Sequence, residues 1–301
     1  MKRFFNPNNI LAFVTVAREG SVSRAAEILN LTQPAISHQI KRLSDETGLS
    51  LFRRTPHGLD LTAEGKDLLP KAQHVLTAMG ELQRNAHTQG GRISGTLRIG
   101  TIVDPEFIRL GLLLNRLKEN HAGIVTELVH GISGEILQKL DRRTIDLGFY
   151  LCAPEEVDDI PSEYPVYTRT LAQFAYRVIA PAGWEAQVAH ASWVDLAALP
   201  WIGTTPMSVH NRLLTKIFSL HNVTQKTVAL VDHEASMLEM VRSGVGLSLC
   251  RESIALHQRQ AYGLTVCETQ KIPACLCTLS LDSQKEAPLM AALFEQLDAV
   301  W

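Results

Sequence analysis

The sequence predicts an α/β protein in which a winged helix-turn-helix is joined by a long linker helix to a two-lobed α/β domain. Three observations predict this order. Two short amphipathic helices flank a tight turn between Ser21 and Leu43, an apolar residue then recurs every 3.5 positions after Thr62, and strand-like and helix-like segments alternate from residue 92. The expected parts are 1–62, 63–91 and 92–301, with one lobe at about 92–166 and 269–301 and the other at about 167–268.

Two capped helices form the centre of the first part. Ser21 can cap a helix with apolar residues at i, i+3, i+4 and i+7, and Asn30 tolerates the left-handed backbone of a short turn. Thr32 can cap the next helix, with Pro34 in its first turn, where a missing N–H costs nothing. A preceding helix, about Asn8 to Arg18, would complete a three-helix core. The residues expected to be buried are Leu11, Val14, Val16 or Ala17, Val22, Ala25, Ala26, Leu29, Ala35, Ile36, Ile40 and Leu43.

The outer face of the second helix has the layout of a DNA-reading helix. Amide and hydroxyl groups lie near its N-terminus, where they would meet base edges, and cations follow, where they would meet phosphates. A basic hairpin around Pro56 and Gly58 can then touch the backbone or minor groove. A small helical bundle with a polar face is the alternative for the helix pair alone, and the hairpin favours DNA. The expected DNA-contacting residues are Ser21, Gln33, Pro34, Ser37, His38, Lys41, Arg42, Arg53, Arg54 and His57.

Charge is divided unevenly between the two parts. Residues 1–92 hold 12 lysines and arginines against 8 acidic residues, whereas residues 93–301 hold 17 against 23. A basic N-terminal part, called the head from here on, joined to an acidic C-terminal part is typical of a protein that contacts nucleic acid through the head alone. Because the excess is modest, we expect one head to bind weakly and two heads on a palindromic site to bind better.

The long helix predicts a dimer. Thr62 can cap a helix that runs to about Gln89, and its apolar residues are spaced 4, 3, 4, 3, 4, which is typical of a coiled-coil seam. Packing on its own domain is the alternative and would favour a wider stripe. Pro70 should remove one hydrogen bond and bend the helix, and the polar run 88–92 marks the domain boundary. The expected seam is Leu68, Ala72, Val75, Met79, Leu82 and Ala86.

The remaining residues predict a largely parallel sheet covered by helices. More than 200 residues allow two lobes, with crossovers expected near Pro165 to Arg169 and Cys267 to Ile272, and a ligand cleft at the carboxyl ends of the strands. Strands are expected at 96–100, 125–129, 145–150, 175–179, 228–231 and 247–250, and helices at 105–120, 133–140, 209–220 and 235–241.

Other classes find little support. No apolar run is long enough to span a membrane and the N-terminus lacks the pattern of a signal peptide, so a cytoplasmic protein is expected. Motifs of serine hydrolases, P-loop enzymes and zinc proteases are missing, which argues against an enzyme. Five cysteines argue against a disulfide framework. A thiolate metal or redox site at Cys275 and Cys277, with Cys267 nearby, is the alternative to buried strand residues, which we favour; no metal site is expected.

Over roughly the first 70 residues the chain resembles, without a gap, the N-terminal domain of LysR-type transcriptional regulators. The resemblance implies that Gln33, Pro34 and Ser37 lie at the major groove and that Arg53 and Arg54 lie near phosphate or the minor groove. Two departures are Ser44, where the family usually has glutamate, and His57, where a cation is common. The matching positions are Phe13, Gly20, Ser21, Ala25, Ala26, Leu29, Gln33, Ser37, Ile40, Leu43, Gly48, Leu51, Phe52, Arg54, Leu61, Thr62 and Gly65.

The second part resembles the family's effector domain more loosely, at 98–100, 145–148 and 241–247. This implies a fold similar to periplasmic solute-binding proteins, used as a sensor for a small-molecule effector with no cofactor. It also implies a sequence-specific DNA-binding regulator that forms a homodimer or homotetramer, with RNA polymerase as a further candidate partner. By analogy the effector-binding residues are Thr101, Ile102, Val103, Asp104, Ile132, Ser133, Thr204, Met207, Ser208, His233, Ser248 and Arg251.

Asp104 has two interpretations, because relatives often have a small hydroxyl residue at its position. It is either a helix cap before Pro105 or a group that meets a cationic or hydroxyl-rich end of the effector. Hydroxyls and free N–H groups at helix starts instead bind anions, typically carboxylates. A DNA-binding architectural protein without a ligand is the remaining alternative, and the two-lobed domain argues against it.

Overall fold

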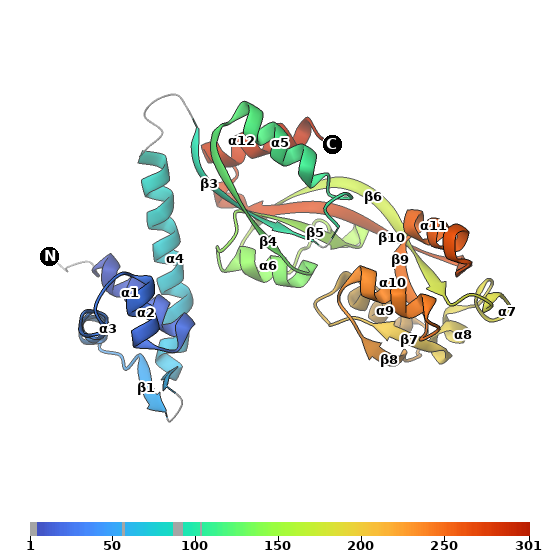
Figure 1. Cartoon of the computed structure of the whole chain (residues 1–301), viewed down its shortest axis with the longest axis horizontal. Coiled ribbons are helices and arrows are strands. Elements are labelled where there is room, and N and C mark those ends of the chain that lie inside the picture. Colours follow the sequence, from blue (N-terminus) through green and yellow to red (C-terminus); the bar gives the residue numbers. More distant parts are fainter. Residues whose placement is uncertain (1–4, 56–57, 87–92, 103) are drawn as a thin grey trace. The chain divides into compact units, whose positions relative to one another are not determined.

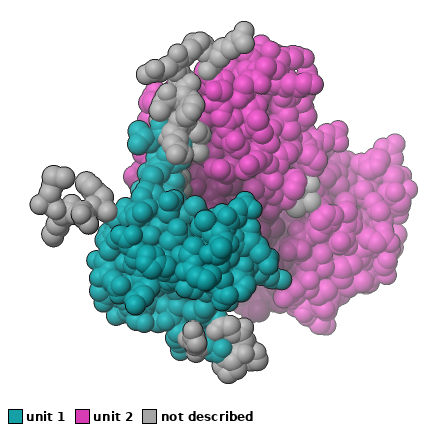
Figure 2. Space-filling view, turned by 60° about the vertical axis from the view of Figure 1, so that its left-hand side comes forward, with its two compact units in different colours: residues 1–91 teal, residues 92–301 magenta. Residues whose placement is uncertain are grey.

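A computed structural model of the chain describes residues 5–55, 58–86, 93–102 and 104–301 (Figure 1). The chain divides into two compact units, residues 1–91 and residues 92–301 (Figure 2). The two units are described separately below. No helix among the described residues is both long and apolar enough to cross a membrane.

The first unit is a winged helix-turn-helix followed by a long helix. Both predicted caps are present: the Ser21 hydroxyl accepts from the N–H of Arg24, and the Thr32 hydroxyl accepts from the N–H of Ala35. Asn30 has a positive φ of 52°, as its turn requires. The elements are α1 (Pro7–Glu19), α2 (Val22–Ile28), α3 (Gln33–Thr47), β1 (Phe52–Thr55), β2 (Gly58–Leu61) and α4 (Ala63–Ala86).

The core of this unit corrects one sequence expectation. Leu11 was expected to be buried, but its side chain is 39% exposed. The buried face of α1 instead includes Ala12 and Phe13, and the fully buried ring of Phe13 meets that of Phe52 edge-on at 5.5 Å. Of the other expected residues, Ala25, Ala26, Ile36 and Leu43 are buried, while Val14, Val22, Leu29 and Ile40 pack against the core from partly buried positions.

Helix α4 begins at a network around Thr62 and continues through Pro70. The Thr62 hydroxyl accepts from the N–H of Gly65 at 2.9 Å and donates to the carbonyl of Ser50. Leu68 and Ala72, two of the expected seam residues, pack into the core of their own unit. This use of the first seam positions was the alternative that the sequence left open.

The second unit is built on a six-stranded sheet of order β4-β3-β5-β10-β6-β9. Only the β3–β4 and β3–β5 pairs are parallel, so the prediction of a largely parallel sheet is wrong for this sheet. A separate two-stranded sheet of β7 and β8 is parallel. The strands are β3 (Ser94–Thr101), β4 (Gly123–His130), β5 (Leu147–Cys152), β6 (Val166–Ala180), β7 (Pro200–Gly203), β8 (Lys226–Leu230), β9 (Ser248–Arg251) and β10 (Thr265–Leu281).

Strands β6 and β10 explain the antiparallel pairing. They run side by side through both halves of the unit (Figure 1). Strand β5 pairs with 275–279 of β10, whereas β9 pairs with 176–179 of β6. The change from one half to the other therefore falls near 174–175 in β6. At 165–169, where the first crossover was expected, β6 begins and is already paired with β10. The second expected crossover, at 267–272, coincides with a register shift in β10.

The four helices expected in this unit are present, one of them with a later start, and the described residues form four further helices, at 185–188, 193–198, 252–262 and 288–298, that were not expected. The helix expected from residue 105 starts only at Leu110, because Arg109 has a positive φ of 49° and interrupts the helical backbone. The helices are α5 (Leu110–Asn120), α6 (Ser133–Asp141), α7 (Glu185–Val188), α8 (Trp193–Ala198), α9 (Val209–Leu220), α10 (Glu234–Arg242), α11 (Glu252–Tyr262) and α12 (Pro288–Asp298), with short 3₁₀ turns η1 (Pro154–Glu156) and η2 (Asp282–Gln284).

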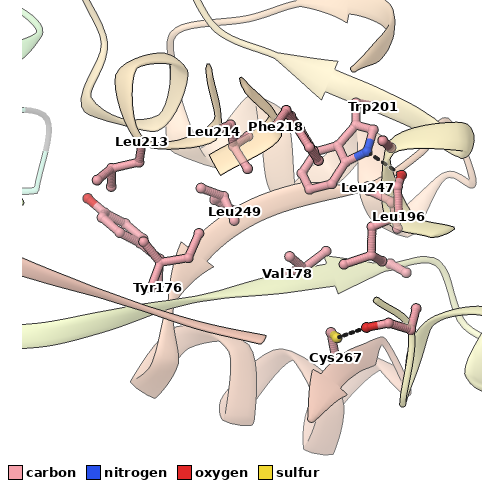
Figure 3. Packing of buried hydrophobic residues seen from close by; sticks show 14 of the residues in the cluster. Tyr176, Val178, Leu196, Trp201, Leu213, Leu214, Phe218, Leu247, Leu249 and Cys267 are labelled. Atoms are coloured by element: carbon pink, nitrogen blue, oxygen red, sulfur yellow. Dashed lines mark hydrogen bonds between the residues drawn. The ribbon is translucent and has the colours of Figure 1, made fainter. Parts of the chain in front are cut away.

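Each half of the second unit has its own apolar core. Figure 3 shows the one around Trp201, whose indole N–H donates to the Leu196 carbonyl at 2.7 Å. In the other half, Phe149 of β5 and Leu113 of α5 are fully buried in one cluster with Met290, Leu293 and Leu297 of α12. These two halves position the residues that line the space between them.

All five cysteines are buried. Cys152, Cys275 and Cys277 share one apolar cluster, while Cys267 belongs to another, so its nearness in sequence does not bring it to the pair. Burial raises the pKa of the Cys275 thiol, and a hydrogen bond with Cys277 together with burial raises the pKa of Cys152. No group of three metal-binding side chains occurs in the described part of the chain. These observations support the interpretation as buried strand residues.

Candidate DNA-reading surface and effector cleft

The exposed face of α3 carries the predicted DNA-contacting residues of this helix. Gln33, Ser37 and Lys41 are four residues apart, as are Pro34, His38 and Arg42, so the six side chains form two adjacent rows on one side of α3. All six are exposed. Polar groups stand in the first turns and the cations follow. A concave surface beside α3 is lined by Gly20, Ser21, Val22, Ser23, Gln33, Ser37, Ile40, Phe52, Thr55 and Leu59.

The wing is tied to the helices beside this concave surface. The N–H of Leu59 donates to the carbonyl of Gly20 at 3.3 Å, which joins β2 to the turn before α2. Arg53 is highly exposed and its guanidinium lies 3.8 Å from the carboxylate of Asp60, a loose contact that leaves the cation accessible. The side chain of Arg54 and all of His57 lie outside the described residues. Ser21 lines the concave surface while its hydroxyl caps α2.

A cavity that opens to solvent lies between the two halves of the second unit, and its empty space of about 620 Å³ includes part of the adjoining solvent. The first half contributes the end of β3, the start of α6 and β5. The second half contributes β6 and the starts of α9 and α10, together with the end of β9. Its lining residues are Ile102, Asp104, Phe107, Gly131, Ile132, Ser133, Leu151, Tyr176, Thr204, Ser208, Val209, His210, Asp232, Glu234, Met237 and Arg251.

The structure brings together seven of the twelve predicted effector residues. These are Ile102, Asp104, Ile132, Ser133, Thr204, Ser208 and Arg251. Four others point elsewhere. Thr101 is buried, with its hydroxyl 2.5 Å from Nδ1 of His130. Ser248 is also buried, with its hydroxyl 3.6 Å from the sulfur of Met237. Met207 packs on Gly134, and His233 is an exposed residue at the N-cap position of α10. Val103 lies outside the described residues.

Several lining residues were not predicted, and one signal in the sequence would have found two of them. Asp232 and Glu234 flank His233 in the approach to α10, where the backbone is extended at His233. Because successive side chains alternate in extended backbone, His233 faces out while its neighbours face the cavity. The other residues that were missed are Phe107, Gly131, Leu151, Tyr176, Val209, His210 and Met237.

Asp104 and Arg251 form an ion pair across the cavity, from the first half to the second. The other carboxylate oxygen of Asp104 accepts from the N–H of Phe107 at 2.9 Å, so Asp104 holds the turn at 105–109, whereas the helix that it was expected to cap starts only at Leu110. The Arg251 guanidinium also lies 4.0 Å from the ring centre of Phe107. The charge of Asp104 is therefore matched within the protein.

Asp232 and Glu234 are the carboxyl groups of the cavity that lack such a match among the described residues, and Glu234 is the more buried of the two. Its side chain makes no hydrogen bond or ion pair within the described residues, and burial raises the pKa of its carboxyl. Nearby, Tyr176 and His210 meet edge-on with ring centres 4.6 Å apart. Burial lowers the pKa of His210 to about 4, so its imidazole is neutral near pH 7. Burial likewise raises the pKa of the Tyr176 phenol, which keeps its proton.

The start of α6 has already satisfied several of its donors. The N–H of Ile132 donates to the carboxylate of Glu135 at 3.2 Å, and the N–H of Gly134 donates to the Met207 carbonyl at 3.0 Å. The Ser133 hydroxyl accepts from the N–H of Leu151 at 3.1 Å. The Gly134–Met207 contact also joins the two halves, and its closeness depends on glycine, because an added Cβ would lie 2.9 Å from Cβ of Met207.

A winged helix-turn-helix followed by a domain with an interlobe cavity defines the class of ligand-responsive DNA-binding regulators. A family model described as a bacterial regulatory helix-turn-helix protein of the lysR family matches residues 7–66, and one described as the LysR substrate binding domain matches residues 90–301. The chain belongs to the LysR family. It is a transcriptional regulator with a DNA-binding and an effector-binding domain, and not an enzyme.

Similar proteins agree with this assignment. The chain is 28% identical to the HTH-type transcriptional regulator DgdR of Burkholderia cepacia over 291 residues, covering 96% of this chain and 92% of DgdR. The structure of full-length CbnR with its target DNA has a TM-score of 0.64 at 19% identity, covering 98% of this chain and all of CbnR. ArgP from Mycobacterium tuberculosis has a TM-score of 0.69 at 16% identity, covering 99% and 97%. At these identities the two structures show the fold alone.

Proposed function

We propose that the interlobe cavity is the effector site through which this regulator is controlled. The observation that carries the proposal is that both halves contribute lining residues and are joined across the cavity by the Asp104–Arg251 pair. A ligand that fills the cavity contacts both halves, so it has a different affinity for open and closed arrangements. Such a difference is what allows a ligand to shift a conformational equilibrium.

DNA is read by α3 and the wing in this proposal. Gln33, Pro34 and Ser37 meet base edges in the major groove, because they are exposed at the start of the helix. His38, Lys41 and Arg42 meet the phosphate backbone. On the wing, Arg53 contacts phosphate or the minor groove, and Arg54 and His57 are proposed there from the sequence alone. The first-turn hydroxyl of Ser21 caps α2 and holds its backbone beside the DNA.

Two copies of α4 form the dimer in this proposal. Val75 and Leu82 are 42% and 70% exposed in the single chain, although both are apolar, and Met79 lies between them in the heptad pattern. Leu68 and Ala72 serve the core of their own unit, so the seam occupies the later part of α4; Ala86 extends it from the sequence alone. A homodimer presents two reading heads to a palindromic site, and a homotetramer presents four. RNA polymerase is the proposed partner of the DNA-bound assembly.

Selection from a randomised double-stranded DNA library tests the proposed reading. The purified full chain should enrich sequences with two similar half-sites, because two heads read the DNA. Gln33→Ala should relax the enriched base preference. Lys118→Ala is the matched control, since Lys118 is an exposed cation on α5 in the other unit. If no sequence is enriched, or if the enriched sequences lack a repeated half-site, the proposed dimeric reading is wrong.

A further inference from the structure

The proposed effector cavity holds more negative than positive charge. Its carboxyl and cationic lining residues, apart from His210, are Asp104, Asp232, Glu234 and Arg251. Asp104 and Arg251 neutralise each other across the cavity. His210 adds no positive charge near pH 7, because burial lowers its pKa to about 4. Asp232, exposed at the rim, and Glu234, further in, are left as the surplus.

Glu234 has a carboxylate without a cationic partner among the described residues. It is the first residue of α10, where a helix dipole favours negative charge, and this location alone would explain an acidic residue in water. Here, however, the side chain is partly withdrawn from water into the cavity and meets no cation among the described residues. The titratable groups that it influences, Tyr176 on β6 and Cys250 on β9, are kept protonated by burial. None of these groups balances its charge.

Thr204 provides an independent sign of a polar ligand. Its side chain lines the cavity and is only 4% exposed, yet its hydroxyl has no hydrogen-bond partner within the described residues. A buried hydroxyl without a partner is costly, so native proteins usually satisfy it. The backbone carbonyl of the same residue is satisfied, because it accepts from the Asn211 side chain at 3.0 Å. The hydroxyl is left without a partner, and its oxygen has almost no accessible surface in the ligand-free protein, so a ligand reaches it only when its neighbours move.

Two positions that would attract an anion are already filled by the protein itself. The N–H of Ile132 at the start of α6 donates to Glu135, which places a carboxylate there. The guanidinium of Arg251 is engaged by Asp104 and stacked on Phe107. A ligand carboxylate would have to displace one of these internal carboxylates and would also approach Glu234.

We propose that the effector is a small organic cation, with an ammonium group beside Glu234, a polar contact to Thr204 and an apolar body. The apolar body would contact the aliphatic side chains of Ile102, Leu151, Val209 and Met237, which come from both halves. A metal ion fits less well, since no group of three metal-binding side chains occurs in the described part of the chain. This inference rests on the proposed effector site and adds the chemical class of its ligand.

Three probes that share one apolar body test the charge preference. The full chain, with a metal chelator present, is titrated by calorimetry with 2-phenylethylamine, 2-phenylethanol and 3-phenylpropionate. The ammonium probe should bind about tenfold more tightly than either of the others, because it alone forms a charge-assisted contact with Glu234. Tightest binding by the carboxylate, or no binding of the ammonium probe at millimolar concentration, overturns the inference.

Paired variants assign the preference to its residues. Glu234→Gln should reduce ammonium binding about tenfold and leave the alcohol unchanged. Glu239→Gln, on the same helix but 67% exposed and outside the cavity, should change neither. Thr204→Val should weaken the ammonium probe several-fold. An ammonium preference that survives Glu234→Gln also overturns the inference.

The DNA selection separates this inference from the proposed function. Intact selection with a carboxylate preference keeps the effector site but removes the cationic class. Intact selection with no binding of any probe removes the cationic class and leaves the DNA-reading proposal standing. Loss of selection by the parent chain contradicts the proposed DNA reading, whatever the probes do.

Discussion

The guanidinium of Arg251, at the end of β9, pairs with the carboxylate of Asp104, in the turn that follows β3. The two residues are 147 positions apart in the chain and belong to different halves of the effector-binding unit. Their pairing therefore has two consequences. It joins the halves across the cavity, and it removes the charge of the one arginine among the described lining residues from ligand recognition.

Asp104→Asn should reverse the ligand preference of the cavity. The change leaves the Arg251 cation largely buried and without its partner, so 3-phenylpropionate should gain about tenfold in affinity while the ammonium probe loses. Calorimetric titration with the same probes measures both changes. Asp298→Asn is the control, because it removes the acidic partner of Arg169 in a more exposed ion pair outside the cavity. Unchanged preference in Asp104→Asn would show that Arg251 does not govern the charge of the site.

Gly134→Ala should weaken ligand binding by holding the halves apart. An added Cβ would meet both Cβ and the carbonyl of Met207 at 2.9 Å, and a contact that close forces one of the two segments to move. We expect ammonium affinity to fall several-fold, measured by calorimetry. Gly111→Ala on α5 is the matched control, because a Cβ there meets nothing within 4 Å. Gly111→Ala should even add about 0.5–1 kcal/mol to the free energy of unfolding. Equal ligand affinity in both variants would contradict the prediction that the added Cβ holds the two halves apart.

Most elements of the fold could be predicted because their signals are local. Caps such as Ser21 and Thr32 and the apolar spacing of α3 act within one or two turns of a helix, and the structure contains them. The pairing of β6 with β10 joins segments about 100 residues apart in the chain, so no local pattern in the sequence indicates it. Strand β10 was missed for this reason.

The cavity was predicted in part because helix and strand ends could be placed but side-chain directions could not. Thr204 and Ser208 flank a short turn before α9 and both face the cavity. Met207, between them, instead packs on Gly134. Similarly, His233 was chosen where its neighbour Glu234 lines the site. A shift of one residue in extended backbone reverses the face, and only tertiary packing decides it.

Glu234 should make the ligand-free protein less stable as the pH rises. Burial raises the pKa of its carboxyl, so the folded state binds this proton more tightly than the unfolded state, and stability falls as pH rises from the ordinary carboxyl range through the raised pKa. Glu234→Gln should remove this loss and unfold at a higher temperature than the parent near pH 7. Below the ordinary carboxyl range the two proteins should unfold alike. Thermal unfolding over a pH series measures the difference.

Comparison with the parent is needed because His210 acts in the opposite direction. Its lowered folded-state pKa makes stability fall as pH falls below the ordinary imidazole range, and both proteins share this effect. Only the difference between them therefore reports Glu234. If the parent is the more stable protein near pH 7, Glu234 already has a partner in the free protein, and its role in ligand binding would lose its basis.

Leu82→Glu should weaken self-association. Leu82 is 70% exposed on α4, and a charge placed in an apolar seam of two helices would be buried without a partner. Sedimentation equilibrium should show a smaller assembly than that of the parent at the same concentration. Leu220→Glu is the matched control, because Leu220 is 75% exposed at the end of α9. An unchanged mass for Leu82→Glu would exclude this part of α4 from the dimer interface.

Lys41→Ala and Gln33→Ala should weaken DNA binding in different ways, although both residues lie in one row on α3. The ammonium of Lys41 meets phosphate in the proposed reading, so its loss should weaken binding to selected and random DNA alike and reduce the slope of log affinity against log salt by about 1. The amide of Gln33 meets a base edge, so its loss should cost about 1–3 kcal/mol on the selected site and little on random DNA.

Fluorescence anisotropy with both DNAs over a series of salt concentrations separates these two effects. Lys118→Ala again provides the control, since it removes the same charge from the other unit and should leave both affinities and the salt slope unchanged. If Gln33→Ala weakens binding to the two DNAs equally, the amide does not read a base. If Lys41→Ala changes base preference instead of the salt slope, the two roles along α3 must be exchanged, with the bases lying nearer the middle of the helix.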